Sequence, residues 1–321
     1  MIDVLTIGDT VVDLIVRVDH FPREDEESIS ASKIVAEVGG AANFLIMAAR
    51  LGLECGLIGC VGDDNYGRLF LDALSSEGID VSGAQIKRNE DTTVCINLLD
   101  KDGRHAFLSV PGASSKLNSK DLDRAKLVAA RALYLSGYAL TSTPTRVCCV
   151  QALRTCRDRR IPIVFDPSPA LDRIPKRVLV EMISSSNIVL LNQAEASRIA
   201  LTRSQTRAAQ HILEIGAGKV VLKLGSRGSL YLNHTQTLRE AALKIHPIDT
   251  TGAGDVFNAA VVLGMLHEIP VRNTLRLANL LGSLTALKTG AGRKVPKIDE
   301  AVKFARDRGL EEIADLLLRH L

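Results

Sequence analysis

The chain has 321 residues, enough for one large α/β domain or two modest ones. Hydrophobic residues make up 46% of it, aromatic residues only 3%, and Trp is absent, so the core has to be built mainly from Leu, Ile, Val and Ala, as in a buried parallel sheet flanked by helices. The formal net charge of +3, without a run of five like charges, argues against a nucleic-acid partner.

The N-terminal third mixes two kinds of pattern. Strands are predicted at 4–7, 11–18, 28–37, 55–61, 94–99 and 105–110, and helices at 41–51 and 66–76. The segments at about 11–37 and 93–110 read as antiparallel strands that do not belong to βα units. We expect them to form a small lid over the carboxyl edge of the main sheet, where open α/β sheets bind ligands.

From about residue 130 onward, strands and helices alternate at the spacing of βα units. Strands are predicted at 132–136, 161–165, 188–191 and 220–224, and helices at 143–158, 175–184 and 206–215. This alternation predicts an α/β fold with a mostly parallel central sheet and helices on both faces, as a single domain over 1–321. The tail at 298–321 is predicted to be one amphipathic helix.

The cysteines and the N-terminus indicate a cytoplasmic protein. The six Cys residues lie mostly in apolar stretches and include no C-x-x-C pair, so we expect reduced, buried thiols rather than disulfides or a zinc site. The N-terminus enters a strand pattern directly and lacks the features of a signal peptide. No apolar stretch is long enough to span a bilayer, so we expect no membrane association.

The segment Asp249–Asp255 combines a glycine-rich turn with two carboxylates, after a stretch at 245–248 that can be extended. Its Gly-Ala-Gly turn at 252–254 lets the backbone approach a ligand, and the helix expected next would direct its free N–H groups at phosphate oxygens. Asp255 in the first turn could accept the proton of an attacking hydroxyl. The alternative is an ordinary helix start that Thr251 or Asp255 caps.

A second glycine turn, Gly39-Gly40-Ala41-Ala42-Asn43, also opens a predicted helix. The double glycine permits close backbone approach and Asn43 can hydrogen-bond a hydroxyl group, although a plain turn with Asn43 as cap is an alternative. Asp13 lies within an apolar strand, where a carboxylate is costly to bury without a partner. Sugar hydroxyls would suit it; an exposed face of a lid strand is the alternative.

The segment Asn192-Gln193-Ala194-Glu195 follows a predicted strand. Its amide and carboxylate, at positions i and i+3, share one helix face and could hold a hydrated Mg²⁺ near phosphates. A helix cap, with Asn192 as N-cap and Glu195 reaching back, is the alternative interpretation, and both can hold together.

Together these segments resemble the PfkB family of carbohydrate kinases, the ribokinase-like group, from residue 8 to about residue 292. The turn at 39–43, with two further glycines at the expected spacing, matches the family's first signature; Leu45 departs from it, since a small residue is usual there. The stretch at 249–262 matches the second signature throughout. The resemblance implies a ribokinase-like three-layer α/β/α fold with a small β lid that often mediates dimerisation, so we expect a homodimer.

The resemblance also implies roles for individual residues. Asp255 resembles the family's general base, and the backbone N–H groups of Gly252, Ala253 and Gly254 resemble its anion hole. Asp13, Gly39, Gly40 and Asn43 resemble the sugar contacts. Asn192 and Glu195 resemble the pair that orders Mg²⁺ through water, and Asn192, Lys223, Gly225, Gly228 and Asn279 resemble nucleotide contacts. Asp249 and Thr251, with the loop at 288–292, resemble a monovalent-cation (K⁺) site.

The implied reaction transfers the γ-phosphate of ATP to a hydroxyl of a small molecule, with positioning and electrostatics supplying most of the rate. Asp13 with the double glycine favours a free pentose or hexose as acceptor, then a nucleoside, then a phosphosugar. Arg104 and His105 could reach a phosphate or carboxylate, but we prefer a solvated hairpin end there. Phe21 and Phe107 are the aromatic residues of the lid segments that could stack on a base, although both can simply pack.

Three alternatives of other kinds remain. A kinase for a vitamin would generally lack the lid segments. A non-catalytic sugar or nucleotide sensor on the same fold would be expected to have lost Asp255. A Rossmann dehydrogenase would need a full G-x-G-x-x-G near the N-terminus, which this chain lacks.

Overall fold

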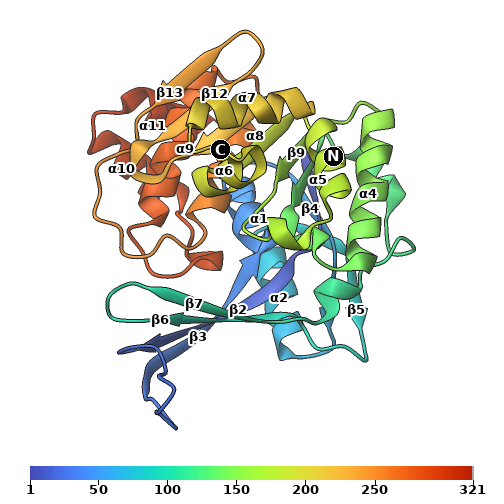
Figure 1. Cartoon of the computed structure of the whole chain (residues 1–321), viewed down its shortest axis with the longest axis vertical. Coiled ribbons are helices and arrows are strands. Elements are labelled where there is room, and N and C mark those ends of the chain that lie inside the picture. Colours follow the sequence, from blue (N-terminus) through green and yellow to red (C-terminus); the bar gives the residue numbers. More distant parts are fainter. Residues whose placement is uncertain (320–321) are drawn as a thin grey trace.

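The computed structural model describes residues 1–319 and has three layers, with one large sheet between two sets of helices (Figure 1). The strands of this sheet follow the order β13-β12-β11-β10-β9-β8-β1-β4-β5. Neighbours from β11 to β5 run parallel, while β12 and β13 continue the edge antiparallel. The strands are β1 (Val4–Ile7), β4 (Cys55–Gly62), β5 (Asp80–Lys87), β8 (Ala132–Ser136), β9 (Ile163–Asp166), β10 (Ile188–Asn192), β11 (Val220–Lys223), β12 (Ser229–Leu232) and β13 (Thr237–Glu240).

The helices divide into two sets because successive side chains of a strand point to opposite faces of the sheet. Val4 packs into the core beneath one set, and the next residue, Leu5, packs into the core beneath the other. The first set is α1 (Ala41–Arg50), α2 (Asn65–Ser76), α8 (Ala253–Leu266), α9 (Val271–Thr285), α10 (Ile298–Arg306) and α11 (Glu311–Arg319). The second is α3 (Arg124–Ala129), α4 (Thr143–Asp158), α5 (Lys176–Ser184), α6 (Gln193–Ala200) and α7 (Gln205–Ile215).

A second sheet of four strands projects from the main body and is called the lid here (Figure 1). Its strand order is β3-β2-β6-β7, with bounds β2 (Thr10–Val18), β3 (Ala31–Gly40), β6 (Val94–Leu99) and β7 (His105–Val110). The β2/β3 and β6/β7 pairs are antiparallel, while β2 and β6 run parallel. β6 and β7 have the predicted bounds and β2 starts one residue early, whereas β3 is shifted from the predicted 28–37 to 31–40 and so includes the glycine pair at 39–40.

The strand order places a topological switch point at β1. From β1 the chain proceeds to β4 and β5 on one side, and later to β8 and its successors on the other. Open α/β sheets bind ligands outside the carboxyl ends of strands at such a point. The lid also begins there, because β2 follows β1 after two residues.

Several elements differ from the sequence-based expectations. The residues at 245–248 belong to no strand, and the strands β5, β12 and β13 and the helices α3 and α9 were not predicted. Residues 298–319 form two helices rather than one, because Gly309 adopts a left-handed φ of 67° between α10 and α11; the last two residues of the predicted helix, 320 and 321, lie outside the described residues. The cysteines are free, and five of the six are buried while Cys95 is half-buried. No helix within residues 1–319 combines the length and the apolar character needed to cross a membrane.

Candidate active site

Four neighbouring strands of the main sheet each end in a polar residue. Ser136 ends β8, Asp166 ends β9, Asn192 ends β10 and Lys223 ends β11. Ser136 pairs with Asp166 across the first two strands, and Asn192 pairs with Lys223 across the last two. Parallel strands finish at one edge of the sheet, so these side chains form a row along it.

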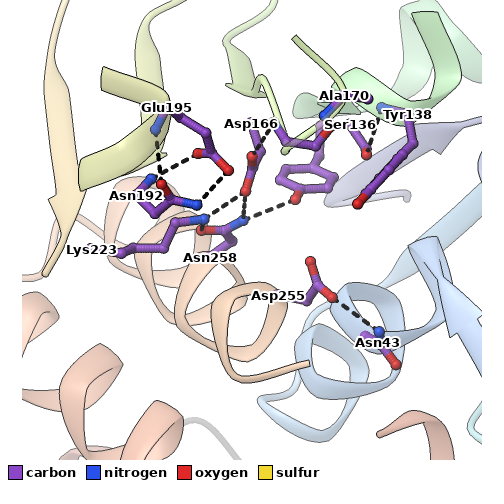
Figure 2. A network of polar contacts seen from close by, with 12 residues as sticks. Asn43, Ser136, Tyr138, Asp166, Ala170, Asn192, Glu195, Lys223, Asp255 and Asn258 are labelled. Atoms are coloured by element: carbon purple, nitrogen blue, oxygen red, sulfur yellow. Dashed lines mark hydrogen bonds and ion pairs between the residues drawn. The ribbon is translucent and has the colours of Figure 1, made fainter. Parts of the chain in front are cut away.

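Lys223 is the centre of a buried polar network at this edge (Figure 2). Its Nζ donates to Asp166 Oδ2 at 2.7 Å and to Asn258 Oδ1 at 3.2 Å. Asn258 in turn donates from Nδ2 to Asp166 Oδ2 at 2.6 Å and to the Tyr134 hydroxyl at 3.0 Å. Burial by itself lowers the pKa of Lys223, but Asp166 and Glu195 outweigh it and the pKa is raised, so the ammonium stays charged.

Asn192 and Glu195 form a capping box at the start of α6, which was one of the two predicted interpretations. Asn192 N donates to Glu195 Oε2 at 2.8 Å, and Glu195 N donates to Asn192 Oδ1 at 2.9 Å. Burial, followed by the charge of Asp166, raises the pKa of Glu195 to about 7. Within residues 1–319 no cluster of three His, Cys, Asp or Glu side chains is arranged to hold a metal directly.

The α8 helix starts in the way that an anion site requires. Gly252 is the N-cap in a left-handed conformation with φ 76°, and it offers no capping side chain to the free N–H groups of the first turn. A Cβ built on Gly252 would lie 2.6 Å from Ala291 Cβ, so only glycine fits there. Ala253 N donates to Thr250 O at 3.2 Å within the turn, and the Lys223 ammonium lies 3.6 Å from where a Gly254 Cβ would be.

Asp255 lies in the first turn of α8 and is oriented by Asn43 of α1, which is 212 positions away in the chain (Figure 2). Asn43 Nδ2 donates to Asp255 Oδ2 at 3.0 Å, while Asn43 Oδ1 accepts from Gly292 N at 2.7 Å. Asn43, predicted as a sugar contact, therefore orients the carboxylate in this structure. Burial raises the pKa of Asp255 to about 6, and the hydrogen bond from Asn43 acts in the opposite direction.

Asp13 lies directly against the glycine pair. A Cβ added to Gly39 would be 2.2 Å from Asp13 Oδ2, so the glycine makes room for the carboxylate. Burial, then the charges of Asp9 and Asp255, raise the pKa of Asp13 to about 7. Among residues 1–319 no hydrogen bond or ion pair holds the Asp13 carboxylate, which leaves it available to a ligand.

Asp249 joins two loops beside the start of α8. Its Oδ1 accepts from Thr251 N at 2.8 Å, and its Oδ2 accepts from Gly290 N at 2.8 Å. His105 of the lid approaches the same carboxylate, with Nε2 3.5 Å from Oδ1, so His105 is not the solvated residue that we expected. Arg104 is exposed and pairs with Asp100.

The residues predicted around the nucleotide base meet at a different part of the edge. Asn279 Nδ2 donates to Ser229 Oγ at 3.1 Å and to the carbonyls of Glu240 and Ala241 at 3.3 and 3.2 Å. Gly228 has φ 84°, and a Cβ there would lie 2.0 Å from Glu240 O. Gly225 has φ 60° with open space around its Cβ position.

Three members of the network at this edge, Tyr134, Asp166 and Asn258, are not among the predicted site residues. Asp166 directly follows the strand predicted at 161–165, and a polar residue in that position is the same signal that identifies Asn192. Asn258 lies three positions after Asp255 in an otherwise apolar helix and is fully buried, which was a second available signal.

The unpartnered carboxylate of Asp13 leads to a stability prediction. Its pKa is 3.8 in the unfolded chain and about 7 when folded, so the cost of ionising it is fully present above pH 7 and disappears as the pH falls towards 4. Asp13→Asn should therefore raise Tm at pH 8 by roughly 2–4 °C, the shift that about 1 kcal/mol gives in a large domain. Calorimetric scans at pH 8 and pH 4.5 measure this.

The exposed Asp63→Asn is the control for the loss of one charge. It should change Tm by less than 1 °C or so at either pH, as surface substitutions usually do. A gain for Asp13→Asn that is equal at both pH values would contradict an ionisation cost at Asp13.

An uncapped helix start, a buried carboxylate in its first turn and a fixed ammonium beside it form the arrangement that a small-molecule phosphotransferase needs. The model of the pfkB family carbohydrate kinases matches residues 1–298. The chain therefore belongs to the pfkB family of carbohydrate kinases, and both the predicted family and the predicted fold are confirmed.

Named relatives are similar over nearly their whole length. The chain is 29% identical over 308 residues to the ATP-dependent ribose-1-phosphate kinase of Halopiger xanaduensis, covering 96% of this chain and 99% of the relative. It is 26% identical to the aminoimidazole riboside kinase of Salmonella typhimurium, with 96% and 97% covered. The structure of Arabidopsis thaliana ribokinase complexed with ribose and ATP superposes with a TM-score of 0.81 at 25% identity, with 95% and 99% covered.

Proposed function

We propose that this carbohydrate kinase transfers the γ-phosphate of ATP to a hydroxyl of a non-phosphorylated sugar or ribosyl group, with a free pentose or hexose favoured. The observation that carries the proposal is the placement of Asp13 and Asp255 near the double glycine, with Asn43 between Asp255 and the loop at Gly292. Carboxylates accept hydrogen bonds from hydroxyls and repel a phosphate. Nucleoside and phosphosugar acceptors remain the alternatives.

In the proposed reaction Asp255 accepts the proton of the attacking hydroxyl while Asn43 holds its carboxylate in place. The backbone N–H groups of Gly252 and Gly254 and the ammonium of Lys223 stabilise charge on the transferred phosphoryl group, whereas Ala253 N, also predicted for this role, already donates to Thr250 O. Closure of the lid over the acceptor would exclude water.

Asn192 and Glu195 are the proposed Mg²⁺ pair. Their side chains are hydrogen-bonded to each other, which suits an ion held through its water shell rather than directly. Glu195 and Asp166 share one ammonium, so a divalent cation with ATP would balance the remaining negative charge. Bound Mg²⁺ would neutralise charge on the phosphates.

Two further features are proposals with their own support. Asp249 already joins the two loops of the proposed K⁺ site, and K⁺ would bind between them with Thr251. The lid carries exposed apolar side chains, Ile34, Leu108 and Val110, which a second copy of the chain would cover in a homodimer.

The test is ADP release from MgATP with D-ribose, D-fructose, adenosine and D-ribose 1-phosphate as acceptors, with KCl or NaCl. We expect one of the three neutral acceptors to have the highest kcat/KM of the panel. Preference for D-ribose 1-phosphate would replace the proposal with the phosphosugar alternative, and binding of ligands without any turnover would favour the sensor.

The acid limb of the pH–rate profile gives a second test. A base has to be ionised to accept a proton, so the pKa of about 6 predicts that kcat falls up to tenfold per pH unit below pH 6. Asn43→Ala removes a hydrogen bond that lowers this pKa, so its limb should move to higher pH. If the acid limb of the kcat profile has the same pKa in Asn43→Ala as in wild type, the limb does not report the ionisation of Asp255.

A further inference from the structure

Asp9 lies at the topological switch point and has no role in the reaction as described so far. It lies two positions after the end of β1, between the carboxyl end of that strand and the lid strand β2. Ser136, at the end of the neighbouring strand β8, lies close enough for its hydroxyl to lower the pKa of the Asp9 carboxyl, against the larger effect of burial. This is the position at which open α/β sheets bind their ligands.

The backbone fixes the direction of the Asp9 side chain. Its φ is 58°, in the left-handed region, where Asp and Asn are the most tolerated residues after glycine. The carbonyl of Asp9 accepts from Ala41 N at 3.0 Å, which joins this turn to the start of α1. The turn and the glycine pair at 39–40 are therefore held together as one unit.

Each glycine of the pair makes room for one carboxylic acid. A Cβ on Gly40 would lie 2.4 Å from Asp9 O and 3.0 Å from Asp9 Cγ, as a Cβ on Gly39 would collide with the Asp13 carboxylate. Asp9 and Asp13 consequently lie side by side against one turn. Burial, followed by the charge of Asp255, raises the pKa of Asp9 to about 7, so Asp255 is close as well.

The surroundings of this pair are acidic. Asp255, Asp166 and Glu37 are the charged groups that act on it, and within residues 1–319 no Lys, Arg or His forms an ion pair with either carboxylate. Glu37 is already paired with Arg293, with 2.8 Å between Oε1 and Nε. A ligand with several hydroxyl donors satisfies such a pair, whereas a phosphate beside it would be repelled.

We propose that Asp9 is a second acceptor-binding carboxylate, which with Asp13 accepts hydrogen bonds from two hydroxyls of a neutral sugar and selects against an acceptor phosphorylated near them. This inference rests on the proposed function, because it takes the glycine turn as the acceptor site. It adds a specificity-determining residue to that site and names the acceptor class as a non-phosphorylated polyol.

Asp9→Asn is the informative substitution, because Asn tolerates the left-handed turn as well as Asp while it removes the charge. Kinetics are measured at saturating MgATP with the best neutral acceptor of the panel and with D-ribose 1-phosphate. We expect KM for the neutral acceptor to rise roughly 10- to 100-fold, the range of one hydrogen bond to a charged group, with kcat within about fivefold. The ratio of kcat/KM for D-ribose 1-phosphate to that for the neutral acceptor should rise.

Asp3→Asn is the matched control, since Asp3 lies just before the other end of β1, where it pairs with Arg131. It should leave both KM values within about twofold, because Asp3 lies at the end of β1 opposite to the site and contacts Glu54 and Arg131 there. Thermal scans of both variants check that each is folded.

Calorimetric binding of the same acceptors with a non-hydrolysable ATP analogue tests Asp9 without turnover. A neutral-acceptor KM and Kd within twofold of wild type in Asp9→Asn would overturn the inference, as would a wild-type preference for D-ribose 1-phosphate. Binding of an acceptor without turnover in wild type would overturn the kinase reaction. The difference in acceptor Kd between wild type and Asp9→Asn would then still show whether Asp9 binds the acceptor. No binding of any of these acceptors would overturn both.

Discussion

Asp255→Asn should lower kcat about 10²- to 10⁴-fold, the usual contribution of a positioned general base. The amide keeps the shape of the carboxylate and can still accept the hydrogen bond from Asn43 Nδ2, so the acceptor site should remain formed. KM for ATP and for the acceptor should therefore change little. Steady-state kinetics at pH 8, where the wild-type carboxylate is ionised, measure the effect.

The same variant carries its own check on folding. The folded pKa of Asp255 is raised from 3.8 to about 6, so above pH 6 the wild-type protein carries a full ionisation cost that the variant lacks. Tm of Asp255→Asn at pH 8 should equal or exceed that of wild type. Asp315→Asn, on the exposed side of α11, is the control for charge, and a kcat for Asp255→Asn within tenfold of wild type would remove Asp255 as the base.

Much of the fold was predictable because local signals were strong. The turn residues Asp100-Lys101-Asp102-Gly103 between two largely apolar runs mark the bounds of β6 and β7, and Pro144 in the first turn marks the start of α4. The short strand β12, between β13 and β11, is buried throughout and shows no alternation, so its four residues cannot be distinguished by periodicity from a buried helix segment. The α9 helix was overlooked although Pro270 precedes it.

The residues of the site could be predicted from the sequence, but the contacts between them could not. Asp255, Asn43 and Lys223 were identified from glycine-rich segments and from a family resemblance, and their individual roles stay predictions. What spacing could not supply is that Asn43 reaches Asp255 across 212 positions, or that Lys223 is held by Asp166 across 57. Such pairs depend on strand order, and strand order is a property of the whole sheet.

The lid illustrates the same limit. His105 and Asp249 are 144 positions apart and were considered separately, one as a hairpin end and the other as part of a cation site. In the fold His105 Nε2 and Asp249 Oδ1 are 3.5 Å apart, because β7 of the lid lies next to the loop before α8. Arg17 Nη2 likewise donates to Thr289 Oγ1 at 2.7 Å. Lid and body are thus connected through the loop at 288–292.

Lys223→Met should reduce both stability and turnover. Its removal leaves Asp166 buried beside Glu195 without a counter-charge, and breaking a buried ion pair by removing one partner costs about 3–5 kcal/mol. It also removes a fixed donor next to Gly254, and the loss of one such donor to a transition state costs about 10²–10³ in kcat. Urea denaturation and steady-state kinetics measure the two effects.

The double variant Asp166→Asn with Lys223→Met separates these effects. Without the carboxylate there is no unpaired charge at the end of β9, so most of the stability should return, while kcat should stay low because the ammonium is still missing. Lys116→Met, whose partner Glu90 lies at the surface 3.4 Å away, should cost no more than about 1 kcal/mol and leave kcat unchanged. Recovery of kcat in the double variant would show that Lys223 only neutralises Asp166 and does not act on the phosphoryl group.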